Sequence, residues 1–284
     1  MKVLNVIVAT DFSNEAYGAL FYVTQLLSSK HCTFHIINSY DDLTSANKTQ
    51  NIIFLGKKEV TRLRNTSLEQ LSKTIHKIKL DNENPLHEFK SISMRGTLAS
   101  ILSQSIDDLQ IDLVIMGSKG KTSVKEVFMG SNTLKVANTI HNCPILAIPK
   151  EIAYAPLSEI AFVTNFKRKW TLQTLAPLKL LASVANAQII VLQISKGKIL
   201  SQKQIFNKNT LAKYLLHIPH CFEEVMEYGD KANVIQNFLS ERKIKMLAMA
   251  HHKRFFFERL FREPVIQDMS IYTKTPFLIL PMPE

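Results

Sequence analysis

The feature that most constrains the fold of this chain is a strand-and-helix pattern that occurs twice. Val3–Ala9 is a short apolar run typical of a buried strand, and Ser13 can cap the helix indicated by the apolar spacing that follows. Past Pro149 the pattern begins again, because Ile160–Thr164 repeats the first strand and Trp170–Val184 repeats the first helix. An internal repeat of this length predicts two copies of one structural unit.

Each copy alternates strands with helices, which indicates right-handed crossovers and a parallel sheet covered by helices on both faces. The expected strands are Val3–Ala9, Cys32–Asn38, Phe89–Met94, Ile111–Met116 and Pro144–Pro149 in the first copy, and Ile160–Thr164, Gln188–Gln193, Phe222–Tyr228, Met246–Ala250 and Pro276–Pro281 in the second. The fold class is therefore α/β, with two tandem five-stranded domains. We place them at residues 1–150 and 151–284, joined by a linker near Lys150–Ser158.

Length and composition restrict the class of protein. A chain of 284 residues with 46% apolar residues can bury a core in each of two domains. No apolar run approaches the roughly 20 residues that span a bilayer, and no signal-peptide pattern is present, so we expect a soluble, cytoplasmic protein that does not bind a membrane. The net charge of +11 is not concentrated in a basic run, which argues against a nucleic-acid binder and favours anionic ligands.

Cysteine and histidine usage gives no sign of a disulfide framework or a metal site. Cys32, Cys143 and Cys221 are odd in number and lack metal-ligand spacing, so we expect reduced thiols that pack as small buried apolar residues. The histidines of the second copy lie at spacings that do not close a recognised metal site. They are His217, His220, His251 and His252.

One stretch of the first copy carries the chemistry of a phosphate site. Ile111–Met116 is a compact apolar run that predicts a buried parallel strand. Gly117 and Gly120 follow it, and because they lack a Cβ their backbone can take a positive φ and a ligand can approach their amides. Gly130 then precedes three polar residues expected to cap the next helix, namely Ser131, Asn132 and Thr133. Free N–H groups, hydroxyl donors and the positive end of a helix dipole are what a phosphate needs.

The spacing of these glycines distinguishes between two known phosphate-binding motifs. Gly120, Lys121 and Thr122 imitate the end of a Walker A loop, but Ile115 stands where that motif requires its first glycine. Glycine, two residues, glycine, nine residues and Gly-Ser, written here GSKGKTSVKEVFMGSNT, instead resembles the nucleotide-binding signature of the universal stress protein family. Three glycines and a serine in register directly after an apolar strand make this match specific.

The resemblance covers nearly the whole chain as two tandem copies. It implies open, five-stranded Rossmann-like domains of the adenine nucleotide alpha hydrolase-like type, and binding of ATP, with or without Mg or Mn. It also implies dimers formed through the edge strand of the sheet. Two copies in one chain can form that contact internally as a pseudo-dimer, with Pro144–Pro149 meeting Pro276–Pro281. A homodimer of whole chains and an unknown protein partner remain open.

The resemblance also assigns candidate site residues. Asp11, at the end of the first strand, would contact the adenosine part of ATP through the ribose hydroxyls, and Thr10 and a backbone group near Ile37 or Asn38 are further candidates. The expected nucleotide-binding set is Thr10, Asp11, Gly117, Lys119, Gly120, Gly130, Ser131, Asn132 and Thr133. Each has a structural alternative: the glycines can shape a tight turn and an ordinary helix cap, the lysines can be merely solvated, and Asp11 can be a helix-start carboxylate that bonds the amides near Ser13.

The second copy departs from the signature at the critical positions. Ala250 and Lys253 stand in place of the first two glycines, and Arg262 and Glu263 replace Gly-Ser. A carboxylate would lie where the phosphate should be, and Asn165 replaces the acid of the first strand. We therefore expect the second copy to have lost the nucleotide site.

The leading hypothesis is a cytoplasmic, ATP-binding stress-response regulator whose only nucleotide site lies in the first domain. No Ser/His/Asp or Cys/His arrangement indicates catalytic residues, so we expect no enzymatic activity. Two alternatives stay open. The first is a slow ATP hydrolase, and the second is a protein-interaction module that binds no nucleotide.

Overall fold

The computed structural model describes residues 2–40, 57–118, 130–150, 152–229, 231–250 and 275–281. Its strands are β1 (Leu4–Ala9), β2 (Cys32–Tyr40), β3 (His87–Arg95), β4 (Leu113–Gly117), β5 (Ile145–Ile148), β6 (Glu159–Val163), β7 (Gln188–Ser195), β8 (His220–Met226), β9 (Leu247–Ala250) and β10 (Phe277–Leu280). Its helices are α1 (Asn14–Leu26), α2 (Lys57–Asp81), α3 (Leu98–Asp108), α4 (Ser131–Thr139), α5 (Leu172–Ala185), α6 (Gln202–Tyr214) and α7 (Lys231–Glu241). Every strand expected from the sequence is present, which confirms the α/β class.

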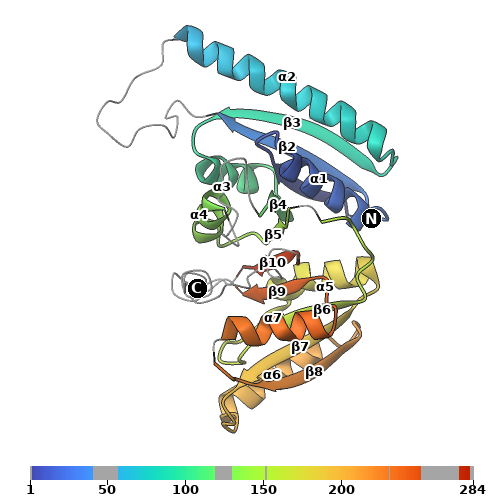
Figure 1. Cartoon of the computed structure of the whole chain (residues 1–284), viewed down its shortest axis with the longest axis vertical. Helices are drawn as coiled ribbons and strands as arrows, with labels where there is room; N and C mark the ends of the chain where they lie inside the picture. The colour runs from blue at the N-terminus through green and yellow to red at the C-terminus, as the bar shows by residue number, and fades with distance from the viewer. Residues whose placement is uncertain are drawn as a thin grey trace, which may run out of the picture.

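The described strands form one continuous sheet in the order β3-β2-β1-β4-β5-β10-β9-β6-β7-β8. Strands β1 to β5 run parallel to one another, as do β6 to β10, and the two sets meet where β5 pairs with β10 in the antiparallel sense. Figure 1 shows the two halves stacked about this contact. The predicted pairing of the last strand of each copy is thus confirmed. Because the sheet runs through both halves, the boundary at residue 150 stays a prediction.

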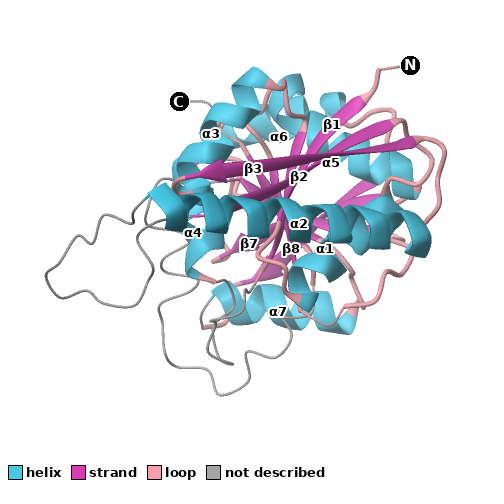
Figure 2. Ribbon diagram, turned by 90° about the horizontal axis from the view of Figure 1, so that it is seen from above, coloured by secondary structure: helices cyan, strands magenta, loops and turns pink. Residues whose placement is uncertain are grey.

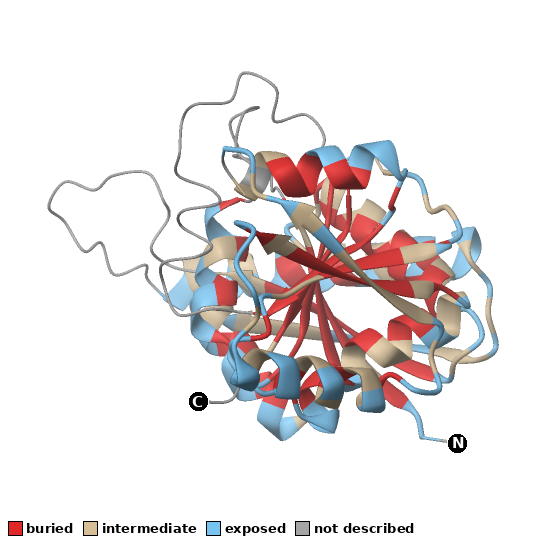
Figure 3. Cartoon of the chain, turned by 90° about the horizontal axis from the view of Figure 1, so that it is seen from below, coloured by how far each residue is buried: buried red, intermediate tan, exposed pale blue. Residues whose placement is uncertain are grey.

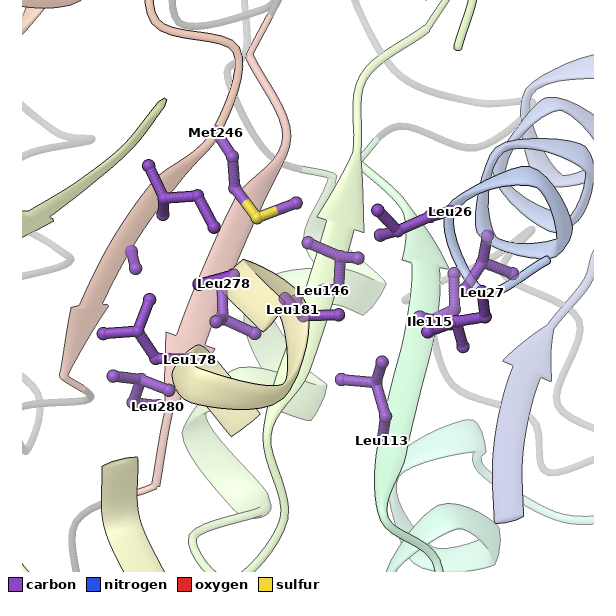
Figure 4. Close-up of a cluster of buried hydrophobic side chains, with 14 of the residues drawn as sticks. Leu26, Leu27, Leu113, Ile115, Leu146, Leu178, Leu181, Met246, Leu278 and Leu280 are labelled. Atoms are coloured by element: carbon purple, nitrogen blue, oxygen red, sulfur yellow. The ribbon is translucent and has the colours of Figure 1, made fainter. Parts of the chain in front are cut away.

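Helices cover the sheet on both faces, as Figure 2 shows. One core lies under α1, α2, α5 and α6, and the other lies under α3, α4 and α7. The inner strands are the most buried elements in Figure 3, because they are covered on both faces, whereas the edge strands β3 and β8 contain no fully buried residue. Both cores extend from one half into the other without a break. Figure 4 shows this for Leu146 of β5 and Leu278 of β10, which lie among leucines from both halves.

Three local expectations need correction. Helix α5 begins two residues after Trp170, because Thr171 and Thr174 form a reciprocal capping pair. Trp170 therefore precedes the helix, and it lies in the core, 3% exposed, with its ring 4.9 Å from that of Phe162. Helices α6 and α7 are not among the sequence-based expectations. Of the cysteines, Cys32 and Cys143 are buried, while Cys221 is only half-buried. Among the described residues, no helix is long and apolar enough to cross a membrane.

We predict that truncating the contact between the halves destabilises the whole chain. Leu278 is fully buried and pairs in register with Leu146. Leu278→Ala should lower the free energy of unfolding in urea by about 2–5 kcal/mol, because it leaves a cavity in a core that both halves share. Leu172→Ala is the matched control, since Leu172 is 56% exposed. Its effect should stay within about 0.5 kcal/mol. Equal effects of the two substitutions would contradict a shared core.

His87, the first residue of β3, has a ring held in an environment that opposes protonation. Its ring centroid lies 5.0 Å from that of Phe34, and Nε2 lies 3.2 Å from the Leu27 carbonyl oxygen. With Nε2 protonated and donating to that carbonyl, Nδ1 is buried without a hydrogen-bond partner in the described chain. Burial lowers the pKa of His87 below its usual 6.5, although the bond to Leu27 opposes this. Burial likewise lowers the pKa of His35.

We therefore predict a loss of stability in mild acid that His87 partly causes. The unfolded chain takes up a proton near pH 6.5 while the folded ring resists it, so this contribution is complete above pH 6.5 and is lost as the pH falls. The melting temperature should fall from pH 7.5 to 5.0, and it should fall less in His87→Phe, which keeps a ring against Phe34. Parallel pH profiles for the two proteins would show that His87 makes no such contribution.

Candidate functional site

The sheet order places the carboxyl ends of β1 and β4 side by side. From β1 the chain crosses to β2 on one side, and from β3 it returns to β4 on the other side, so β1 and β4 flank the point where the strand order reverses. Ligands of open α/β sheets bind in the crevice at such a point. Val8 pairs with Ile115, and continuing this register by two residues brings Thr10 opposite Gly117. Two segments separated by a hundred residues are thus brought to one edge.

The passage from β4 to α4 is held by backbone bonds on either side of the undescribed residues 119–129. Ser118 donates its N–H to the Ile148 carbonyl at 2.7 Å, and Gly130 donates its N–H to the Ser118 carbonyl at 2.6 Å. These bonds bring the first turn of α4 against the end of β4. The chain therefore enters and leaves this loop at nearly the same point, at the carboxyl edge of the sheet.

The helix cap differs from the sequence-based expectation. Gly130, not one of the three polar residues after it, is the N-cap of α4, so no side chain caps this helix. Thr133 turns inward instead, and its Oγ1 donates to the Gly117 carbonyl at 3.0 Å. Ser131 and Asn132 are exposed. Gly130 has a φ of −63°, and Gly117 is the last strand residue of β4, so neither glycine is there to supply a positive φ. The first amides of α4 thus have no side-chain cap.

The turn after β1 is built around Phe12, which has a φ of +62°. Thr10 Oγ1 accepts the N–H of Phe12 at 3.0 Å, and Asp11 Oδ1 accepts the N–H of Ser13 at 3.0 Å. Ser13 in turn accepts the N–H of Ala16 and caps α1. Asp11 itself is exposed. One of its carboxylate oxygens therefore bonds the amide at the start of α1, which is the structural role that the sequence left open for Asp11. Its exposure leaves the side chain accessible at the crevice.

The second half repeats this turn after β6, although it lacks the glycines that follow β4 in the first half. Phe166 has a φ of +55°, and Thr164 Oγ1 accepts its N–H at 3.3 Å. Asn165 Oδ1 accepts the N–H of Lys167 at 3.1 Å, as Asp11 does for Ser13. The turn is thus a structural device common to both halves. What distinguishes the first half is the carboxylate and the residues that follow β4.

A buried hydrogen-bond chain beneath the turn escaped the sequence-based analysis. Asn38 Nδ2 donates to the Thr10 carbonyl at 2.8 Å, Ser67 Oγ donates to Asn38 Oδ1 at 2.8 Å, and Ser93 Oγ donates to Ser67 Oγ at 2.7 Å. The chain links α2 and β3 to the end of β1. The sequence signal that could have indicated this hydrogen-bond chain is the polar Asn38 near the end of an otherwise apolar strand. The Ile37 carbonyl, considered with Asn38 in the sequence, accepts the N–H of Thr10 at 2.8 Å.

Several candidate residues lie outside the described part of the chain. They are Lys119, Gly120 and Lys121 of the first half, and His251, His252, Lys253, Arg262 and Glu263 of the second. Ala250 is described, and it ends β9 as Gly117 ends β4. Within the described ranges no three metal-ligating side chains gather at one point.

Comparison with known proteins identifies the family. The model of the universal stress protein family matches residues 3–149. The chain belongs to the universal stress protein family. A universal stress protein of Methanocaldococcus jannaschii is 26% identical over 150 residues, which cover 50% of this chain and 92% of that protein. Its relationship is thus to one half of this universal stress protein.

Solved structures extend the likeness of fold to both halves. A universal stress protein from Archaeoglobus fulgidus is 14% identical, with a TM-score of 0.69 over 97% of this chain and 95% of that chain. A structure from Pseudomonas aeruginosa, described as a putative universal stress protein, is 9% identical, with a TM-score of 0.54 over 97% of this chain and 92% of that chain. The paired arrangement of two such units is therefore shared with other proteins.

We predict that the buried hydrogen-bond chain stabilises this edge of the sheet. Asn38→Ala removes the donor to the Thr10 carbonyl and leaves the Ser67 hydroxyl without its acceptor. The free energy of unfolding should fall by about 1–3 kcal/mol, because buried polar groups lose their partners. Asn142→Ala is the control, since the bond from Asn142 to Asp107 is exposed, and it should change stability by less than about 0.5 kcal/mol. If Asn38→Ala leaves the free energy of unfolding unchanged, the buried hydrogen-bond chain is not needed for stability.

Proposed function

We propose that this universal stress protein binds an adenine nucleotide, ATP, at the crevice between the carboxyl ends of β1 and β4. The observation that carries the proposal is the N-terminus of α4 at that crevice, capped by Gly130 without a side chain. Its first amides can donate to phosphate oxygens, and the helix dipole adds positive potential at the same place. The family signature in the sequence supports the same assignment.

Roles for the other groups follow from their positions. The exposed Ser131 can donate its hydroxyl to phosphate, and the exposed Asp11 can accept from ribose hydroxyls across the crevice. Thr133 and Asn38 act indirectly, because their bonds to Gly117 and Thr10 fix the two strand ends between which the nucleotide would lie. The net charge of +11 favours approach of an anionic ligand.

We further propose that the protein is a cytoplasmic regulator of stress responses, not an enzyme. The nucleotide site belongs to the first half, since the second half has Asn165 and Ala250 where the first has Asp11 and Gly117. In this view the second half serves as a structural or partner-binding module. Nucleotide occupancy of the first half would then be the signal that a protein partner reads.

We predict that a carboxylate at the start of α4 separates nucleotide binding from stability. Ser131 is the exposed first residue of α4. Ser131→Glu should leave the free energy of unfolding unchanged or slightly higher, because an acid favours a helix N-terminus. It should weaken ATP at least tenfold in calorimetric titrations with Mg or Mn, because it repels phosphate. Leu172→Glu adds the same charge to the first residue of α5 and should not alter ATP binding.

The results that would overturn the proposal are separate for binding and for activity. Absence of heat with ATP, together with no stabilisation at high ATP, would remove nucleotide binding; a true ligand at 100 times its dissociation constant adds about 2.7 kcal/mol. Equal ATP affinity in wild type and Ser131→Glu would place the nucleotide elsewhere. Phosphate release that follows the protein through purification and is lost in Asp11→Asn would replace the regulator with a slow ATP hydrolase.

A further inference from the structure

A cleft of about 770 Å³ lies between the two halves, away from the proposed nucleotide crevice. One wall is formed by residues at the amino ends of β1, β4 and β5, among them Leu4, Asp112 and Pro144. The opposite wall is the face of α5 that carries Ala176 and Leu180. The cleft continues the contact between the halves, because Pro144 directly precedes β5 and Pro281, which also lines it, directly follows β10.

The pseudo-twofold relation between the halves gives this cleft a counterpart against α1. Ser13 and Thr171 are the N-caps of α1 and α5, so Tyr22 corresponds to Leu180 and Gly18 to Ala176. Strands β5 and β10 end equivalently, one residue before Pro149 and Pro281. The counterpart cleft therefore begins at Pro149, at the start of the linker.

In the first half the linker itself fills the counterpart cleft. Beyond Pro149 the chain runs along α1 to β6 (Figure 1), and Ile152 and Tyr154 pack against the core. The Tyr154 ring lies 5.4 Å from that of Tyr22 in an edge-to-face arrangement, and Lys150 Nζ lies 3.1 Å from a Glu15 carboxylate oxygen. Tyr22 is consequently only 2% exposed.

The equivalent face of α5 is less covered. Leu180, in the position of Tyr22, is half-buried, and so is Pro177, whereas its counterpart Ala19 is fully buried. Ala176 is exposed. The same groove that an extended segment closes on α1 is thus accessible on α5. Its size also falls within the range of about 300–1,000 Å³ usual for ligand sites.

We propose that this α5 cleft binds an extended peptide segment of a partner protein, in the way that the linker binds α1. The segment carries an apolar residue and, two positions on, an aromatic residue, as Ile152 and Tyr154 do, because alternate residues of an extended chain point to one side.

The charge of the wall formed by the amino ends of β1, β4 and β5 sets a further requirement. On the α1 side, Lys245 Nζ donates to the Pro156 carbonyl at 3.4 Å. Counted back from the last residues of β9 and β4, Ala250 and Gly117, Lys245 corresponds to Asp112, which lines the α5 cleft. Asp112 pairs with Lys2, whose side chain is 74% exposed while that of Asp112 is 20% exposed, and its second oxygen accepts the Asn5 N–H at 3.0 Å. An ammonium as solvated as that of Lys2 is held weakly and can be replaced by another cation. The peptide therefore presents a basic residue where the linker has Pro156.

The test uses the intact chain and a fluorescein-labelled peptide with the sequence of residues 150–157 carrying Pro156→Lys. Fluorescence anisotropy should show saturable binding to wild type. Leu180→Arg should weaken it at least tenfold, and so should Ala176→Trp, which fills the cleft from an exposed position and need not disturb folding. Leu172→Arg, on the same helix but outside the cleft, is the matched control and should bind as wild type does.

Three results would overturn the proposal. The first is absence of saturable binding to wild type. The second is equal binding to wild type, Leu180→Arg and Ala176→Trp, which would mean that the peptide acts elsewhere, for example by displacing the linker from α1. The third is equal binding of a peptide that also carries Tyr154→Ala, or competition by N-acetyltyrosinamide at the same concentration as the peptide, which would make the cleft a small-molecule site.

Discussion

The antiparallel pairing of β5 with β10 is the interaction on which the rest of this structure depends. Each half alone would leave an apolar edge strand exposed, and an unpaired edge of this kind invites association with other chains. Joining the two edges makes one sheet and two continuous cores. Because the pairing is antiparallel, the carboxyl end of β5 lies beside the amino end of β10.

At the candidate site the structure separates groups that hold the backbone from groups that face outward. Thr133 and Asn38 donate hydrogen bonds to the carbonyls of Gly117 and Thr10, while Ser131 and Asp11 are exposed at the same edge. This division suits a ligand that is recognised mainly by amides, because amides can bind phosphate only when the backbone around them is fixed. It also explains why a site of this kind needs few distinctive side chains.

Much of the fold could be predicted from the sequence, because strands buried on both faces give compact apolar runs. Helix α6 could not, since only Asn207 and Leu211 of its residues are buried and its sequence carries no clear apolar stripe. The candidate site was predictable in outline through glycine spacing. Its supporting contacts were not, because the bond from Thr133 to Gly117 and the chain through Asn38, Ser67 and Ser93 join residues distant in sequence. Such contacts follow from tertiary packing, which periodicity does not record.

Fusion of the two halves has a consequence for how such a protein can change. In a dimer of identical chains, every substitution occurs twice, so a change that harms the ligand edge of one subunit harms the other as well. In this chain the two partners of the β5–β10 contact are encoded separately, and each side of the contact can vary while the other is kept. Ala250 can thus stand where the first half has Gly117, although both halves still carry the turn around Phe12 and Phe166. Because the two halves are parts of one chain, their contact no longer requires them to be identical.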